Sequence, residues 1–347
     1  MAEGAAVQSE LQCHACGGQT RFDPTSGVLK CESCGTERAI AVDPAINAAA
    51  EHIYDADKAS PEPARRAQGR THKCQTCGGA VTFHGAALSE RCAYCNGPMV
   101  RIEGDAAFAA MALIPFKVPS DAAVTAMKAW TKRRLAAPSD LFEAVEAGRV
   151  AALYAPFFTF DSLEALQYWG SYRVHRKNSS TIRSVSGRFQ ATFDDLLVPA
   201  SPHVTPLLRD GMLHEFDPRA LKPFAPDYLA GFAAEHHHLT VAEGLKANAA
   251  DKALLIRNRI QRHAGRKLSD LRYETDTSDI RYRRILLPVH ILHYEYEGKP
   301  YRLVCCGLEG RAYGERPFSR WKIMGYATAI STLAFGLGAV WGALGWL

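Results

Sequence analysis

The chain has 347 residues, 47% hydrophobic and 22% charged, so it is long enough for a substantial hydrophobic core beside smaller modules. Its net charge of +5 is too small to indicate a nucleic-acid partner by itself. The first ten residues have neither a basic start nor an apolar run, so they predict a free tail and no signal peptide.

Eight of the ten cysteines form one spacing pattern that occurs twice. The first copy contains Cys13, Cys16, Cys31 and Cys34, and the second contains Cys74, Cys77, Cys92 and Cys95. Two residues between paired cysteines allow a tight knuckle to direct both sulfurs at one ion, and Gly17 and Gly78 can adopt the positive φ that completes it. Two such knuckles make a closed tetrahedral site. The pattern therefore predicts two zinc ribbons, each holding one structural Zn²⁺.

Disulfides and rubredoxin-like iron remain open as alternatives to zinc. Thiolate metal sites need a reducing compartment, so the cysteines place this part of the chain in the cytosol. Each ribbon is too short to fold on a hydrophobic core, and we expect its metal to supply about 10–16 kcal/mol of folding energy. The expected boundaries are 1–40 for the first ribbon, 41–71 for a linker and 72–104 for the second ribbon.

The linker carries an alanine-rich patch followed by Pro61 and Pro63, which predict a short helix and a flexible connection. A basic cluster then leads into the second ribbon: Arg65, Arg66, Arg70, His72 and Lys73. We interpret this cluster mainly as a solvated segment, with nucleic-acid contact as the alternative.

Residues 105–320 predict a β-rich α+β cytosolic domain. Ser120 is expected to cap a helix that ends before Pro138, and a long helix is expected over Thr240–Ala264. Alternating or β-branched runs predict strands, and a hairpin is expected at Glu297-Gly298. The strand runs are Leu113–Phe116, Val150–Phe160, Tyr168–His175, Val185–Phe193, Arg281–Glu297 and Lys299–Gly307.

Two short motifs occur in both halves of this domain. Lys222-Pro-Phe224 is similar to Ile114-Pro-Phe116, and Leu287-Pro288 is similar to Ala155-Pro156. The repetition raises the hypothesis of an internal duplication.

The C-terminal segment 323–347 contains no charged residue and is long enough to cross a bilayer as one helix. Arg311, Arg316, Arg320 and Lys322 precede it, so the positive-inside rule keeps the N-terminal body in the cytosol. A buried helix of a soluble protein is the alternative. Within the segment Ala334, Gly338 and Gly342 share one face, which favours helix association and a homo-oligomer.

A basic patch lies at the end of the long helix and consists of Arg257, Arg259, Arg262, Arg266 and Lys267. It has three interpretations: a solvated face, contact with an anionic membrane surface, or nucleic-acid binding. The run of His236, His237 and His238 is expected at a solvated helix end, because consecutive helical residues do not converge on one ion. Cys305 and Cys306 are expected to point to opposite faces of a strand, with one of them in the core.

No phosphate-binding loop, dinucleotide fingerprint, zinc-protease motif or nucleophile elbow occurs in the sequence. We therefore expect a protein that is not an enzyme, with no catalytic residues.

Several longer motifs resemble a bacterial family of TFIIB-type zinc-ribbon membrane proteins, whose members are often mislabelled as primosomal replication-restart helicases. The motifs are Cys92 to Pro98, Ile114-Pro-Phe-Lys117 with Trp130, Tyr154-Ala-Pro-Phe-Phe158, Glu215-Phe-Asp-Pro218, Lys222-Pro-Phe224, Tyr228 to Phe232, Leu287-Pro-Val289 and Tyr294 to Tyr301. Cys305 to Gly310 departs from the asparagine-glycine turn usual in that family. The helicase label does not suit this chain, which lacks ATPase motifs.

The resemblance implies a protein of the inner (cytoplasmic) membrane that works with phage-shock-type and SPFH (flotillin-like) proteins in envelope stress. Together these features predict a non-enzymatic adaptor with one transmembrane helix, two zinc ribbons and a cytosolic body. The alternative is a nucleic-acid-binding zinc-ribbon protein tethered to the membrane.

Overall fold

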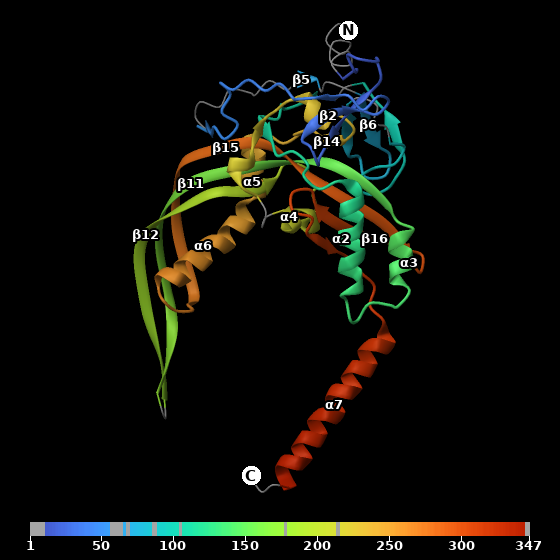
Figure 1. Cartoon of the computed structure of the whole chain (residues 1–347). Coiled ribbons are helices and arrows are strands. Elements are labelled where there is room, and N and C mark those ends of the chain that lie inside the picture. The colour runs from blue at the N-terminus through green and yellow to red at the C-terminus, as the bar shows by residue number, and fades with distance from the viewer. Residues whose placement is uncertain are drawn as a thin grey trace.

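The computed structural model describes residues 11–55, 65–66, 70–84, 89–103, 106–176, 179–212 and 216–343. The expected tail (1–10), both linker prolines, Glu215 and the last four residues of the expected span lie outside the described residues. The expected α+β class is confirmed: a large sheet is flanked by helices, and two four-cysteine clusters lie near the N-terminus (Figure 1).

Three long strands form the framework of the large sheet: β11 (Arg149–Arg176), β12 (Ser179–Pro199) and β15 (Ser269–Tyr296). β11 lies between the other two and pairs antiparallel with both. The strands curve into an arch whose far end is the β11–β12 hairpin (Figure 1). Sequence patterning divided this region into shorter strands, whereas the structure joins Val150–Phe160 and Tyr168–His175 into one continuous β11.

A buried carboxylate explains why the continuity of β11 escaped prediction. Glu164 points inward, where an apolar residue is the usual sign of a strand, and its side chain is fully buried. The hydroxyls of Thr275 and Thr277 donate to it over 2.5 and 2.8 Å, and Lys252 forms an ion pair with it. Because these partners satisfy the carboxylate, a charge is tolerated inside the sheet.

Short strands extend the same sheet on both sides of the arch. They are β4 (His52–Ile53), β6 (Arg70–Cys74), β7 (Ala80–Phe83), β8 (Met99–Arg101), β10 (Ala112–Leu113), β13 (Lys222–Pro223), β14 (Ala233–Glu235), β16 (Lys299–Cys306) and β17 (Ala312–Gly314). The first ribbon has its own sheet of β1 (Thr20–Asp23), β2 (Val28–Cys31) and β3 (Glu37–Arg38), and β5 (Arg65–Arg66) pairs with β9 (Ala106–Ala107). The described parts of the linker, 41–55, 65–66 and 70–71, contain β4, β5 and the start of β6 but no helix, so the short helix expected from its alanine-rich patch is wrong.

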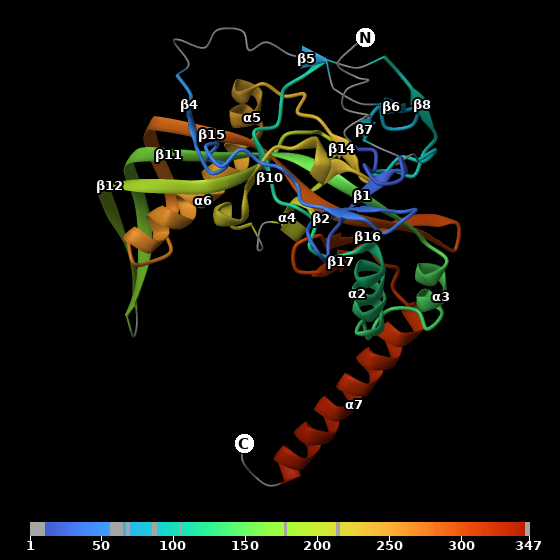
Figure 2. The ribbon, with the colours of Figure 1, turned by 45° about the horizontal axis from the view of Figure 1, so that its top comes forward.

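Helices cover the concave side of the arch and its opposite end (Figures 1 and 2). They are α2 (Ser120–Lys132), α3 (Leu141–Glu146), α4 (Pro206–Met212), α5 (Val241–Ala247) and α6 (Ala249–His263), with one-turn helices at Pro218–Ala220 and Pro226–Leu229. The single helix expected over Thr240–Ala264 is broken at Asn248. Ser120 begins α2 as its first residue instead of capping it, since Pro119 occupies the N-cap position.

The repeated motifs meet in space. β10 pairs antiparallel with β13, and Ala155 lies opposite Leu287 in the β11–β15 register. β10 also runs parallel to β15, as β14 does to β11, so each short strand joins the long strand of the other half. The internal duplication stays a prediction.

Helix α7 (Arg320–Ala343) extends away from the body (Figures 1 and 2). Its segment Arg320–Val340 is long and apolar enough to cross a membrane, and none of its most apolar window is buried in the structure. Ala334, Gly338 and Gly342 fall within α7, and a Cβ added to Gly338 would meet no described atom within 4 Å outside the neighbouring backbone of the helix itself. Self-association through this face stays a prediction.

Candidate metal centres

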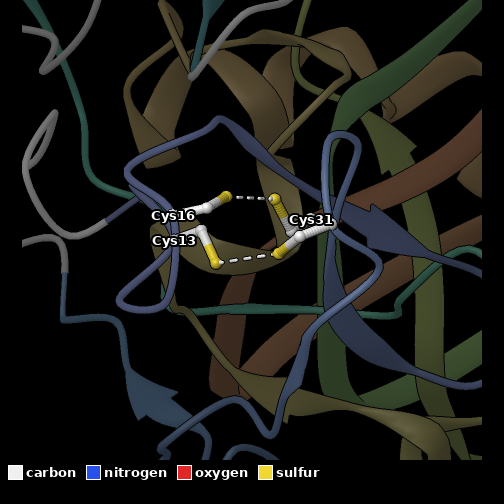
Figure 3. Close-up of side chains that lie close together, drawn as sticks. Cys13, Cys16 and Cys31 are labelled. Carbon is white, nitrogen blue, oxygen red and sulfur yellow. Dashed lines mark hydrogen bonds between the residues drawn. The ribbon is translucent and has the colours of Figure 1, made fainter.

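The eight cysteines of the repeated pattern come together as two separate groups of four. In each group every sulfur lies within 4.8 Å of the others. Cys13 Sγ lies 3.7 Å from Cys34 Sγ, and Cys16 Sγ lies 3.5 Å from Cys31 Sγ; Figure 3 shows three of these side chains turned toward one centre. The corresponding distances in the second group are 3.4 Å for Cys74–Cys95 and 3.8 Å for Cys77–Cys92.

These distances distinguish a metal site from the disulfides that the sequence left open as an alternative. A disulfide requires sulfurs about 2.05 Å apart, and all ten cysteines are free. A tetrahedral ion with bonds of about 2.3 Å places its four sulfurs roughly 3.8 Å apart. Both groups match this second geometry, so both can hold a metal ion. Zinc and iron have similar tetrahedral thiolate sites, so the geometry leaves the identity of the metal open.

Backbone geometry prepares the sulfurs for metal binding. Gly17 and Gly78 adopt φ of +72° and +78°, as the knuckle pattern predicts, and the fourth knuckle uses Asn96 at +63° instead of glycine. The N–H groups of Thr76, Tyr94 and Gly97 each lie 3.4 Å from a cysteine sulfur of the second group. Such donors stabilise the thiolate, which is the form that binds metal.

Hydrogen bonds favour the thiolate at two of the four cysteines of the first group. The backbone N–H groups of Cys34 and Ser33 lower the pKa of Cys31. The hydroxyl and N–H of Thr36 lower the pKa of Cys34 to about 6, and Thr36 Oγ1 lies 3.1 Å from its sulfur.

The two centres differ in how they join the body. Cys16 and Cys34 of the first group are exposed, and this ribbon packs on the body through Leu11, Phe22 and Leu29 instead of through its cysteines. In the second group Cys74 and Cys92 are buried in the same hydrophobic core as residues of β11 and β15. β6 and β7 of this ribbon are strands of the large sheet. The second centre is therefore part of the core of the body.

Four side chains of the body fasten the last knuckle of the second ribbon. Tyr94 Oη donates to Glu235 Oε2 over 2.5 Å, and Ser201 Oγ donates to the other carboxylate oxygen over 2.7 Å. His293 Nε2 donates to the carbonyl of Ala93 over 2.7 Å, and Arg149 donates to Asn96 Oδ1 over 2.9 Å. Sequence reasoning missed these partners, because they lie far away in the chain and no motif connects them to the cysteines.

Glu235 is fully buried, and burial raises its pKa to about 7 although Tyr94 and Ser201 donate to it. Since the ordinary value is 4.5, the folded protein retains a proton that the unfolded chain loses between about pH 4.5 and 7. Its contribution to the free energy of unfolding is therefore present at low pH and lost as the pH rises, by about 3 kcal/mol over this window.

We expect Glu235→Gln to remove this pH dependence, because the amide has a similar shape and never ionises. Chemical denaturation of the metal-loaded full chain in detergent, between about pH 5 and pH 8, measures the difference from wild type at each pH. The variant should gain relative stability as the pH rises. A difference that is independent of pH would contradict the assignment.

The other residues singled out in the sequence take structural positions. His237 is buried and its Nε2 lies 3.0 Å from the carbonyl of Phe157, while His236 contacts Thr82; the solvated helix end expected for them is wrong, since both follow strand β14. Cys305 and Cys306 belong to two different core clusters on opposite faces of β16, so both are buried instead of one.

The basic patch on and after α6 is exposed at all five positions. The guanidinium groups of Arg257, Arg259 and Arg266 lie over Tyr273, Phe193 and Tyr172. These contacts hold α6 against the concave face of the arch and leave the positive charge toward solvent. The choice among the three interpretations of the patch stays open.

No family model matches the chain, and no solved structure matches it. Among curated proteins, a relative from Bacillus subtilis (strain 168), named uncharacterized protein YdjG, is 26% identical over 334 residues. The aligned region covers 92% of this chain and 93% of the relative. The similarity therefore includes far more than the two cysteine motifs.

Proposed function

We propose that the chain is a non-enzymatic adaptor, anchored in the inner membrane by α7, with its body in the cytosol and two structural Zn²⁺ ions. The observation that carries the proposal is the exposure of α7. Its large apolar side chains include Ile330, Leu333, Phe335 and Leu337, each 62% exposed or more. Burying such a side chain is worth about 1.5–3 kcal/mol, so an apolar environment for the helix is strongly favoured over water.

The zinc assignment rests on the donor set. Four thiolates in a closed tetrahedron suit Zn²⁺, and no ligand position is left open for a substrate. The ions would therefore stabilise the ribbons, with catalysis excluded from these sites by their closed geometry. We assign protein binding to the surface of the first ribbon around the exposed ligands Cys16 and Cys34. The candidate partners are the SPFH-type and phage-shock-type proteins that the sequence resemblance suggests.

Affinity purification of the full chain from detergent-solubilised membranes tests the adaptor function. We expect specific membrane-associated proteins to co-purify and to be lost in Cys13→Ser/Cys16→Ser, which removes the first centre. A matched control, Gln167→Ser/Gln190→Ser on the outer face of the arch, should retain them. Recovery of the same proteins with the wild type, the cysteine variant and the glutamine control would contradict the assignment of the first ribbon as the docking surface.

The alternative, a membrane-tethered nucleic-acid-binding protein, makes a distinct prediction. Binding through the basic residues beside the second ribbon would weaken linearly on a log–log plot against salt concentration. We expect the purified full chain in detergent to show no such binding to single-stranded or double-stranded DNA or RNA at low salt. Micromolar or tighter salt-dependent affinity would favour the alternative over the adaptor.

A further inference from the structure

The loop between α2 and α3 is joined to the beginning of α7. The N–H of Ser319 donates to the carbonyl of Ala136 over 2.9 Å, and Lys322 Nζ donates to the carbonyl of Ala137 over 2.8 Å. Tyr326 Oη donates to the carbonyl of Leu135 over 3.1 Å. Three successive carbonyls of the loop accept these hydrogen bonds, so the loop and the first turns of α7 are held together.

This attachment determines the depth of the loop relative to α7. Tyr326 lies about 9 Å along the helix axis from Arg320. A tyrosine near the cytosolic end of a membrane helix places its hydroxyl in the interfacial layer. The backbone of Leu135 accepts from that hydroxyl and so lies at the same depth.

Apolar side chains are exposed on this part of the surface. Leu135 is 77% exposed, and Phe318 and Trp321, which precede or begin α7, are 58% and 80% exposed. An isolated exposed leucine needs no explanation, but these side chains surround the start of a candidate membrane helix. Their position suits the interfacial layer of a bilayer.

Positive charge accompanies the apolar side chains. The cations are Lys132 at the end of α2, Arg133 and Arg134 on the loop, and Arg316, Arg320 and Lys322 beside it. The nearby carboxylates of Glu146 and Glu315 pair with Lys128 and Arg302 instead. The six cations form no ion pair with a carboxylate in the described part of the chain, and Lys132, Arg133 and Arg320 are exposed. Arg134 is half-buried with its Nε atom buried, and Lys322 donates to the carbonyl of Ala137. Anionic groups outside the chain can therefore reach the exposed cations.

Three of these cations lie over aromatic rings. Lys132 Nζ lies 4.3 Å from the Phe142 ring centre, and the Arg134 guanidinium lies 4.3 Å from that of Trp130. Arg316 lies 5.0 Å from the ring centre of Phe318. Aromatic rings flanked by cations are typical of protein surfaces at the boundary between lipid and water.

We propose that the α2–α3 loop, residues 133–137, is a second membrane-contacting element that inserts Leu135 into the interfacial layer and binds anionic phospholipid headgroups through Arg133 and Arg134. The inference rests on the proposed insertion of α7 in the membrane. With two contacts the body is held at a defined angle to the bilayer. Figures 1 and 2 show α2, α3 and the start of α7 together at one end of the body.

Lipid photocrosslinking of the reconstituted full chain tests the contact. A benzophenone amino acid is placed at Leu135, at Leu333 within α7, or at Ile53 on β4. Ile53 is a matched control, because it is 74% exposed and its strand β4 lies far from α7 (Figure 2). The vesicles contain phosphatidylcholine alone or with phosphatidylglycerol, and mass spectrometry counts the lipid adducts.

We expect adducts at positions 135 and 333 and only background at 53. Labelling at 333 with only background at 135 would overturn the loop contact while leaving the anchor intact. Background at all three positions would overturn the anchor itself, so the two failures are distinguishable. A crosslink from 135 to a second copy of the chain instead of to lipid would also overturn the proposal.

A second experiment tests the binding of anionic phospholipid headgroups. Phosphatidylglycerol should increase the labelling at position 135 several-fold, because an anionic surface attracts the basic residues beside it. Arg133→Gln/Arg134→Gln should abolish this increase, whereas Lys73→Gln/Arg101→Gln on the second ribbon should preserve it. Equal labelling with both lipid compositions would overturn the assignment of anionic headgroups.

Discussion

Replacing Cys74 and Cys77 by serine is expected to unfold the body of the protein, whereas the same change at Cys13 and Cys16 should leave the body folded. The second centre contributes Cys74 and Cys92 to the core shared with β11 and β15. Structural zinc supplies about 10–16 kcal/mol, and a whole domain is stable by only about 5–15 kcal/mol. Loss of the second ion is therefore enough to remove the native state of the body.

Hydrogen exchange of the full chain in detergent measures this difference. Amides of the paired segments of β11 and β15 should lose protection in Cys74→Ser/Cys77→Ser and keep it in Cys13→Ser/Cys16→Ser. Metal analysis of Cys13→Ser/Cys16→Ser should find one zinc ion per chain. If these amides kept full protection in both variants, the second ribbon would be an independent module. That result would contradict the role in the core that we assign to the second centre.

Deleting residues 325–347 is expected to move the protein from the membrane fraction to the soluble fraction. The described part of this segment is an apolar helix, and none of its most apolar window is buried in the structure. Its exposed apolar side chains correspond to on the order of 10 kcal/mol of transfer free energy, which exceeds any partial attachment by the α2–α3 loop.

Fractionation after alkaline washing measures the effect of the deletion. A variant with a leucine-rich helix in place of residues 325–343 is the matched control: it should stay in the membrane but lose any self-association through Ala334, Gly338 and Gly342. Membrane retention of the truncated chain would show that α7 is not the anchor.

Sequence patterns predicted those features of the protein that depend on residues close together in the chain. Four cysteines in two close pairs can meet only by forming knuckles, and an uncharged run such as 323–347 is informative by itself. The hairpin at Glu297-Gly298 was also predictable, and both residues adopt the positive φ that a tight turn requires. In each case the deciding residues are neighbours in the sequence.

The parts that could not be predicted depend on distant partners. Glu164 and Glu235 read as polar interruptions in the sequence, yet both are buried because residues from other strands or from a metal knuckle satisfy them. The equal spacing of the two ribbons likewise suggested equal roles. Packing separates them: the environment of Cys92 is the core of the body, whereas Cys16 is exposed.

Crosslinking with mass spectrometry on intact membranes tests the adaptor proposal most directly, because it detects the neighbours of the full chain without extraction. Lys30, which is exposed on the first ribbon, offers a reactive amine for this purpose. We predict reproducible crosslinks from Lys30 to another membrane-associated protein, lost in the chain that lacks residues 325–347. Crosslinks within the chain alone, or a partner set that does not change when α7 is removed, would contradict a membrane-anchored adaptor.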